Sequence, residues 1–172
     1  MLWLRSLAAL LLVPGSVAVL VPALILRHQS AARSPGFSLP GLAAGLMILA
    51  GSALLLACVW QFFRYGRGTL APIDPPRRLV VSGLYRFTRN PMYNAVGLVL
   101  VGEAALFRST SLLAWLAAFV TVVHLFVVFS EEPALKRRFG RSYEDYRQAV
   151  PRWGLAHRPY EAPPAAPISD SR

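Results

Sequence analysis

Residues 89–133 read RNPMYNAVGLVLVGEAALFRSTSLLAWLAAFVTVVHLFVVFSEEP. The segment contains two apolar runs, 92–107 and 110–129, separated only by a short polar turn at residues 108–110. Such a short connection predicts two antiparallel helices, over about 92–107 and 110–130. Asn90 and Pro91 predict the start of the first helix, because asparagine is favoured at the N-cap and proline at the first helical position.

Two further runs without charge cover residues 7–26 and 39–63. A helix needs about 20 apolar residues to cross a bilayer, so each run predicts a membrane-spanning helix. A cleavable signal peptide is the alternative for the first run, although its apolar core would be shorter. Small residues in the second run predict close approach of a neighbouring helix; they are Gly41, Gly45 and Ser52. The expected fold class is an all-α integral membrane protein with about four transmembrane helices, in a single domain over residues 1–153.

The composition agrees with a membrane protein and excludes several other classes. Of the 172 residues, 55% are hydrophobic and 15% are charged, which is too apolar for a disordered chain. A single cysteine excludes a disulfide scaffold. The net charge of +10 is typical of proteins that bind nucleic acids. The apolar excess argues against that class, and we expect no nucleic-acid partner.

The basic residues are distributed unevenly over the loops that four helices would create. Fifteen of the 18 Lys and Arg residues fall on one side, which carries the N-terminus, the loop before residue 90 and the C-terminal tail. Because cytoplasmic loops carry the excess of basic residues, both termini are expected in the cytoplasm. We expect a multi-pass protein, in a bacterial inner membrane, whose arginines contact anionic membrane lipids.

The segment after the hairpin has an amphipathic pattern. Its apolar and aromatic residues recur at spacings of three and four, which predicts a cytoplasmic helix over about 133–150; they are Leu135, Phe139, Tyr143, Tyr146 and Val150. The apolar stripe would either lie on the membrane or cover the cytoplasmic ends of the hairpin. Prolines and small residues predict disorder over residues 154–172.

The hairpin brings two oppositely charged motifs to the same end. Arg89 precedes the first helix, where free backbone N–H groups favour an anion. Glu131 and Glu132 are expected to end the second helix, because Pro133 disfavours its continuation, and two carboxylates there would oppose the helix dipole. An unfavourable arrangement of this kind suggests that the two glutamates have a function. One interpretation is a salt bridge between Arg89 and a glutamate. The other is a site for a ligand with a carboxylate and an ammonium group, such as the methionine moiety of S-adenosylmethionine.

Two longer segments contain these motifs and carry a family resemblance. They read SGLYRFTRNPMY at residues 82–93 and EEPALKRRFGRSYEDYRQAVPRW at residues 131–153. Together they resemble the isoprenylcysteine carboxyl methyltransferase family and the related phospholipid N-methyltransferases, over residues 79–153. The resemblance implies an integral membrane enzyme that uses S-adenosylmethionine, with its cofactor site at the cytoplasmic end of the hairpin.

The resemblance also implies roles for single residues. Gly83 and Gly102 match structural glycines of the family. The implied cofactor-binding residues are Tyr85, Arg89, Asn90, Pro91, Tyr93, Glu131 and Glu132. Asn90 stands where the family usually has histidine, so any role that needs an imidazole is in doubt.

The expected activity is methyl transfer to a lipophilic or lipid-linked acceptor at the cytoplasmic membrane face. A carboxylate is the favoured acceptor, with Arg89 as the catalytic residue that orients it. A phospholipid amine is the first alternative, and a steroid-type reductase or a non-catalytic membrane scaffold are the others. No metal site is expected.

Two ionisable residues lie inside the hairpin helices. His124 lies seven residues before Glu131, so an ideal helix would place both on nearly the same face, about 10 Å apart. It is a candidate catalytic residue that would line the pocket or handle a proton; the alternative is a neutral histidine bonded to a neighbouring helix. Glu103 is expected near Arg108 at the opposite end, as a surface contact.

Overall fold

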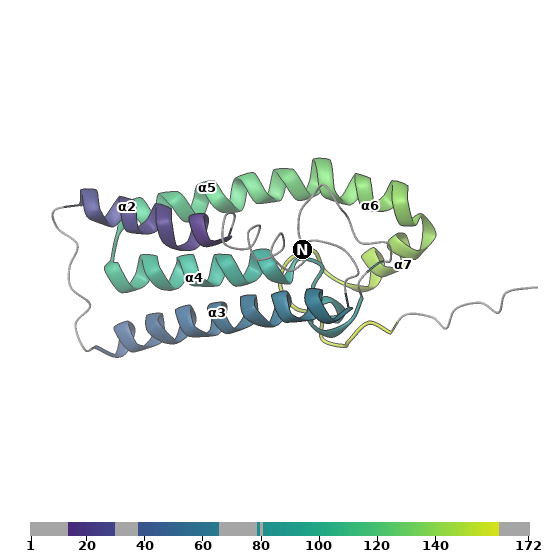
Figure 1. Cartoon of the computed structure of the whole chain (residues 1–172), viewed down its shortest axis with the longest axis horizontal. Helices are drawn as coiled ribbons and strands as arrows, with labels where there is room; N and C mark the ends of the chain where they lie inside the picture. Colours follow the sequence, from purple (N-terminus) through teal and green to yellow (C-terminus); the bar gives the residue numbers. More distant parts are fainter. Residues whose placement is uncertain (1–13, 30–37, 66–78, 80, 162–172) are drawn as a thin grey trace, which may run out of the picture.

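A computed structural model describes residues 14–29, 38–65, 79 and 81–161, and every regular element among them is helical (Figure 1). In chain order the elements are the π turn η1 (Ser16–Leu20), α2 (Val21–His28), α3 (Leu39–Tyr65), the 3-10 turn η2 (Gly83–Arg86), α4 (Pro91–Phe107), α5 (Thr110–Phe126), the π turn η3 (Val127–Glu131), α6 (Glu132–Phe139) and α7 (Arg141–Ala149). Helix α4 lies between α3 and α5, while α2 packs against α5 (Figure 1).

The fold class predicted from the sequence is confirmed: this is an all-α membrane protein. Two helices, Leu39–Gln61 and Thr110–Phe139, are long and apolar enough to cross a membrane by length and composition. The shorter apolar helices are Ser16–His28 and Pro91–Leu106. Of the first predicted helix, residues 7–13 lie outside the described residues, and the described part continues to His28.

The turn between α4 and α5 follows from its residues. Arg108 adopts a left-handed conformation with φ of 48°, which ends α4. The Ser109 hydroxyl accepts a hydrogen bond from the Leu112 N–H at 3.2 Å and so caps α5. The same hydroxyl donates to Gln29 Oε1 at 2.8 Å, which ties the end of α2 to the turn. The hairpin is therefore closed by local capping and held by a neighbouring helix.

The helix break predicted at Glu132 is absent, because the second hairpin helix continues from Thr110 to Phe139. The Glu132 N–H donates to the Val127 carbonyl, which is the i to i−5 bond of a π turn. Proline clashes with the carbonyl four residues earlier in a regular α-helix. Pro133 lies in the first turn of α6, directly after this wider turn, which accommodates its ring. The two glutamates thus lie within a continuous helix, and the predicted conflict with its dipole does not arise.

The predicted tail helix over 133–150 is two helices, α6 and α7, because Gly140 breaks it with φ of 52° and ψ of −124°. The stripe on α7 is buried against the protein. Tyr143, Tyr146 and Val150 are 1–3% exposed. They pack with partly buried apolar residues, namely Leu79, Val81, Leu135, Phe139 and Tyr160. Of the two placements considered for this stripe, the structure therefore has the one that covers the protein.

The disorder predicted from residue 154 onward is wrong for residues 154–161. The Ala156 and Tyr160 N–H groups donate to the carbonyls of Phe87 and Arg86, at 2.7 and 2.9 Å. Backbone carbonyls that are buried on folding need hydrogen-bond donors from the protein. We call residues 151–161 the C-terminal strap, since they run along the loop that precedes α4. Residues 162–172 lie outside the described residues.

Helices α3 and α4 approach closely at two glycines. A Cβ atom on Gly102 would lie 2.8 Å from the Ala44 carbonyl oxygen and 2.7 Å from Ile48 Cγ1. A Cβ atom on Gly51 would likewise lie too close to Ala95 and Val99 of α4. A Cβ atom on Gly45, for which the sequence predicted this role, would meet nothing within 4 Å. The contact therefore depends on Gly51 and Gly102.

We predict that Gly102→Val lowers the free energy of unfolding by about 1–3 kcal/mol, because the added side chain overpacks the contact with α3. The matched control is Gly97→Ala on the same helix, where a Cβ meets nothing within 4 Å. That control should be neutral or slightly stabilising, since alanine favours helix more than glycine does. Denaturant unfolding in detergent micelles measures both, and equal midpoints would contradict the prediction.

Candidate active site

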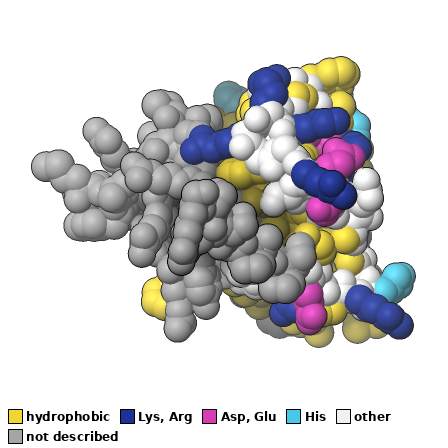
Figure 2. Space-filling view, turned by 90° about the vertical axis from the view of Figure 1, so that its right-hand side faces the viewer, with side chains coloured by type: hydrophobic (Ala, Val, Ile, Leu, Met, Phe, Trp, Pro, Cys, Tyr) yellow, Lys and Arg dark blue, Asp and Glu magenta, His cyan; other side chains and the backbone are white. Residues whose placement is uncertain are grey.

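Charged side chains lie on the face of the molecule at the end where α4 begins and where α5 continues through η3 into α6 (Figure 2). The loop before α4 is fixed by Gly83, whose φ of 57° favours glycine. The Leu84 N–H donates to Gln61 Oε1 at 3.2 Å, so this loop is bound to the end of α3. A Cβ on Gly83 would collide with the Gln61 side chain. The loop thus delivers Tyr85 and Arg89 to a defined position.

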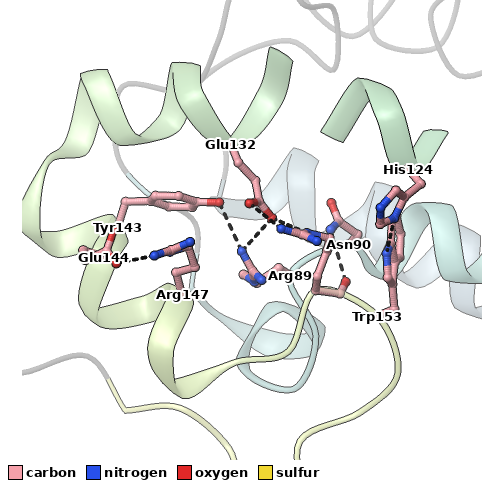
Figure 3. Close-up of polar contacts among 9 residues, drawn as sticks. Arg89, Asn90, His124, Glu132, Tyr143, Glu144, Arg147 and Trp153 are labelled. Atoms are coloured by element: carbon pink, nitrogen blue, oxygen red, sulfur yellow. Dashed lines mark hydrogen bonds and ion pairs between the residues drawn. The ribbon is translucent and has the colours of Figure 1, made fainter. Parts of the chain in front are cut away.

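Glu132 is the centre of an ionic cluster with two arginines (Figure 3). Arg89 Nη1 donates to Glu132 Oε1 at 2.7 Å. Arg152 Nε donates to the same oxygen at 2.6 Å, and its Nη2 donates to Oε2 at 2.9 Å. The Arg89 and Glu132 side chains are only 10% and 11% exposed. Charge-assisted bonds in such a position are strong and geometrically specific.

The structure therefore contains the salt bridge that the sequence offered as one interpretation, and assigns it to Glu132. This salt bridge uses only some of the hydrogen-bond donors of Arg89. Its Nη1 also donates to the Tyr143 hydroxyl at 3.4 Å, whereas its Nε is buried and has no acceptor among the described residues. Buried donors are nearly always paired in proteins. An anionic ligand would supply the missing acceptor.

Glu131 has a different environment from its neighbour. The Tyr93 hydroxyl donates to Glu131 Oε2 at 3.4 Å, and no Lys or Arg within the described ranges forms an ion pair with this carboxylate. Burial raises the pKa of Tyr85 far above its ordinary value, and the charge of Glu131 is one of the smaller contributions. The Glu131 carboxylate and the Tyr93 ring thus form a pair suited to a cation.

Asn90 occupies the N-cap position of α4, but its side chain makes no capping bond. Its Nδ2 donates instead to the Arg152 carbonyl at 3.2 Å. Asn90 therefore stands at the predicted helix start, but the expected side-chain cap is absent and the hydrogen bond of its side chain goes to the C-terminal strap. The first turn of α4 is left without a side-chain cap, and Pro91 begins it.

His124 is exposed and contacts the C-terminal strap rather than a neighbouring helix. The Trp153 indole N–H donates to His124 Nδ1 at 3.1 Å (Figure 3). The two ring centroids are 6.1 Å apart. The π turn between His124 and Glu131 also changes the rotation that an ideal α-helix would give between them. The proposed proton-handling role of His124 stays a prediction.

We predict that His124→Ala leaves the rate of the methyl transfer expected from the sequence unchanged and lowers the free energy of unfolding by about 0.5–1.5 kcal/mol, the net value of one hydrogen bond. Trp153→Phe removes the same bond from its other partner and should have a similar effect on stability. Initial rates and thermal unfolding of both variants test this. A large loss of rate in His124→Ala alone would restore the catalytic role.

Sequence reasoning missed the role of Arg152. It lies 20 residues after Glu132, and no local spacing relates the two, since α6, a glycine break and α7 intervene. Tyr143 and Tyr146 were identified only as members of an apolar stripe. Each also has a polar contact: Tyr143 with Arg89, and Tyr146 through its hydroxyl, which donates to the Tyr85 carbonyl at 2.6 Å.

Comparison with known proteins identifies the family. The family model described as phospholipid methyltransferase matches residues 41–142, which is more than half of the chain. The chain belongs to the phospholipid methyltransferase family. This confirms the resemblance seen in the sequence and implies a membrane methyltransferase. No curated protein and no solved structure matches the chain. The match includes α4, α5, α6 and most of α3, and ends before the strap.

Proposed function

We propose that this phospholipid methyltransferase family member transfers a methyl group from S-adenosylmethionine to a lipophilic acceptor at the cytoplasmic face of the membrane. One observation carries the proposal. The start of α4 has a buried unpaired donor on its preceding loop, Arg89 Nε, and its Tyr93 contacts an acid without an ion-pair partner among the described residues, Glu131. The methionine moiety of the cofactor carries the complementary charges, a carboxylate and an ammonium.

The residues present fit that moiety. Arg89 and the uncapped first turn of α4 would bind the carboxylate, because both offer N–H donors and positive charge. Glu131, Tyr85 and Tyr93 would bind the cationic groups through one carboxylate and two aromatic rings. Glu132 would act indirectly, by holding Arg89. Pro91 would fix the start of the helix, and Asn90 would join it to the strap.

The chain would contribute orientation and exclusion of water. When bound, S-adenosylmethionine supplies an electrophilic methyl group on a sulfonium. The described residues would hold that group in one position, which reduces the entropic cost of reaction with a second molecule. The strap and the buried tyrosines Tyr143 and Tyr146 would keep water from this end of the bundle. We assign no chemical step to His124.

The acceptor we propose is an amine, as the family description suggests, with the carboxylate as the alternative. Arg152 is bound to Glu132 through the fork, and the remaining donors of Arg89 are assigned to the cofactor carboxylate, so little cationic capacity would be left for a second carboxylate from the acceptor. An amine must also be neutral before it attacks, which requires a base or a substrate that is already deprotonated.

We also propose the topology that the basic residues predict, with four membrane-crossing helices and both termini in the cytoplasm. Helix Thr110–Phe139 would then extend beyond the bilayer, since 30 residues span about 45 Å and the hydrocarbon core about 30 Å. The part of this helix beyond the bilayer would carry the exposed basic residues Lys136, Arg137 and Arg138. A lipid acceptor would reach the polar cluster sideways from the bilayer.

The test uses purified protein in nanodiscs with methyl-labelled S-adenosylmethionine. One set of discs contains phosphatidylethanolamine and the other a farnesylated cysteine derivative in phosphatidylcholine. We expect label in the aminophospholipid. Label only in the cysteine derivative would assign the carboxylate alternative. Absence of both cofactor binding and label would contradict the proposed function.

A further inference from the structure

Two arginines share Glu132 unequally. Arg152 binds it in the fork geometry, with Nε on Oε1 and Nη2 on Oε2, at 2.6 and 2.9 Å. Arg89 reaches only Oε1, and only through Nη1. Within the described residues, Oε2 accepts from Arg152 alone. The bidentate arrangement that arginine and carboxylate prefer is therefore taken by Arg152 and is closed to Arg89.

The arrangement leaves Arg89 with capacity to spare. Its guanidinium has donors on three nitrogens, and Nε remains buried, with no partner within the described part of the chain. Two arginines facing one carboxylate also leave an excess of one positive charge. If Glu132 had only Arg89 as a partner, the pair could close as a neutral fork. The donors of Arg89 would then be consumed within the protein.

We propose that Arg152 is a positioning residue that occupies Glu132 and thereby keeps Arg89 available for an anionic ligand. This inference rests on the proposed function, in which that ligand is the carboxylate of the methionine moiety. It assigns a role to a residue beyond the segment that the family match covers.

The backbone around Arg152 is fixed for this role. The Arg89 N–H donates to the Pro151 carbonyl at 3.0 Å, and Asn90 Nδ2 donates to the Arg152 carbonyl at 3.2 Å. The next residue, Trp153, binds His124 of α5. The strap therefore holds Arg152 directly against the start of α4. The hydrogen bond to Glu132 raises the pKa of Arg152, so the guanidinium stays charged.

The experiment compares two ligands that differ in the methionine moiety. S-adenosylhomocysteine has the carboxylate and the ammonium, whereas 5′-methylthioadenosine lacks both. Calorimetry on the full chain in detergent gives the affinity of each for the wild type, Arg152→Ala, Arg152→Lys and Arg158→Ala. Arg158 is an exposed arginine of the same strap and serves as the control.

We expect Arg152→Ala to weaken S-adenosylhomocysteine about tenfold or more, the value of one charge-assisted hydrogen bond, and to leave 5′-methylthioadenosine unchanged. Arg152→Lys should recover part of the affinity, because lysine can neutralise Glu132 as a point charge but cannot form the fork. Arg158→Ala should bind both ligands as the wild type does.

Equal weakening of both ligands by Arg152→Ala would overturn the inference, since it would indicate a general loss of structure at the strap. No weakening of either would overturn it too. If Arg152→Ala does not fold, the same comparison on Arg152→Lys decides by the same two criteria. A wild type that binds neither ligand would instead contradict the proposed function, and with it this role of Arg152.

Discussion

Glu132→Ala is expected to lower the free energy of unfolding by about 3–5 kcal/mol, the largest loss among the substitutions considered. Glu132 is the shared acceptor of Arg89 and Arg152, at 2.7 and 2.6 Å, and its side chain is 11% exposed. Its removal leaves a nearly buried guanidinium and a partly buried one without their anion. Thermal unfolding in detergent micelles, followed by circular dichroism, measures the loss.

The control for this prediction is Glu144→Ala. Glu144 also has two basic partners, Arg147 at 2.5 Å and Lys136 at 3.7 Å, but the side chains of these partners are 42% and 66% exposed. Exposed ion pairs contribute little to stability, so the midpoint should barely move. Glu132→Gln should fall between the two, since an amide oxygen still accepts a hydrogen bond but carries no charge. Equal midpoints for Glu132→Ala and Glu144→Ala would show that the arginines of the cluster are solvated.

Glu131→Gln is expected to weaken binding of S-adenosylhomocysteine by about 2–5 kcal/mol, which is roughly 30-fold to several thousand-fold, and to reduce methyl transfer accordingly. The proposed function makes Glu131 the anion for the cationic part of the methionine moiety. Its own contact within the protein is a long hydrogen bond from Tyr93, which glutamine can still accept. Stability should therefore change little. Calorimetry and labelled-methyl transfer measure the two effects.

Glu103→Gln is the matched control for the same chemical change. Glu103 lies on α4, about 18 Å along the helix from Pro91, and has a buried oxygen without a hydrogen-bond partner among the described residues. Its amide variant should bind the ligand as the wild type does. Unchanged affinity in Glu131→Gln would remove this residue from the proposed site, whereas a fall in its unfolding midpoint would assign it a structural role.

Adjacent glutamates thus have opposite expected consequences, one for stability and one for binding. Successive residues on a helix point about 100° apart, so neighbours contact different elements. Glu132 faces the arginines of the α4 loop and the strap, while Glu131 faces Tyr93. The adjacent residues Glu131 and Glu132 therefore occupy two positions with different surroundings.

Much of the fold could be predicted from local patterns. The apolar runs, the polar turn at residues 108–110 and the proline at position 91 led to helices close to the observed α3, α4 and α5. These signals are local, because a helix depends on residues three and four apart and on the caps at its ends. The antiparallel hairpin alone predicts that Arg89 and the glutamates lie at the same end of the bundle.

Other features depended on residues distant in the chain. Pro133 does not end its helix, because a π turn accommodates it, and Asn90 bonds to the strap instead of capping α4. Arg152 reaches Glu132 only because α6 and α7 reverse the chain at Gly140 and return the strap to the hairpin. The partner that such a polar side chain binds depends on which nearby donors and acceptors the packing leaves unpaired. The sequence thus specifies the helices and the residue types of the site, whereas the different surroundings of Glu131 and Glu132 arise from the packing of α4, its preceding loop and the strap around them.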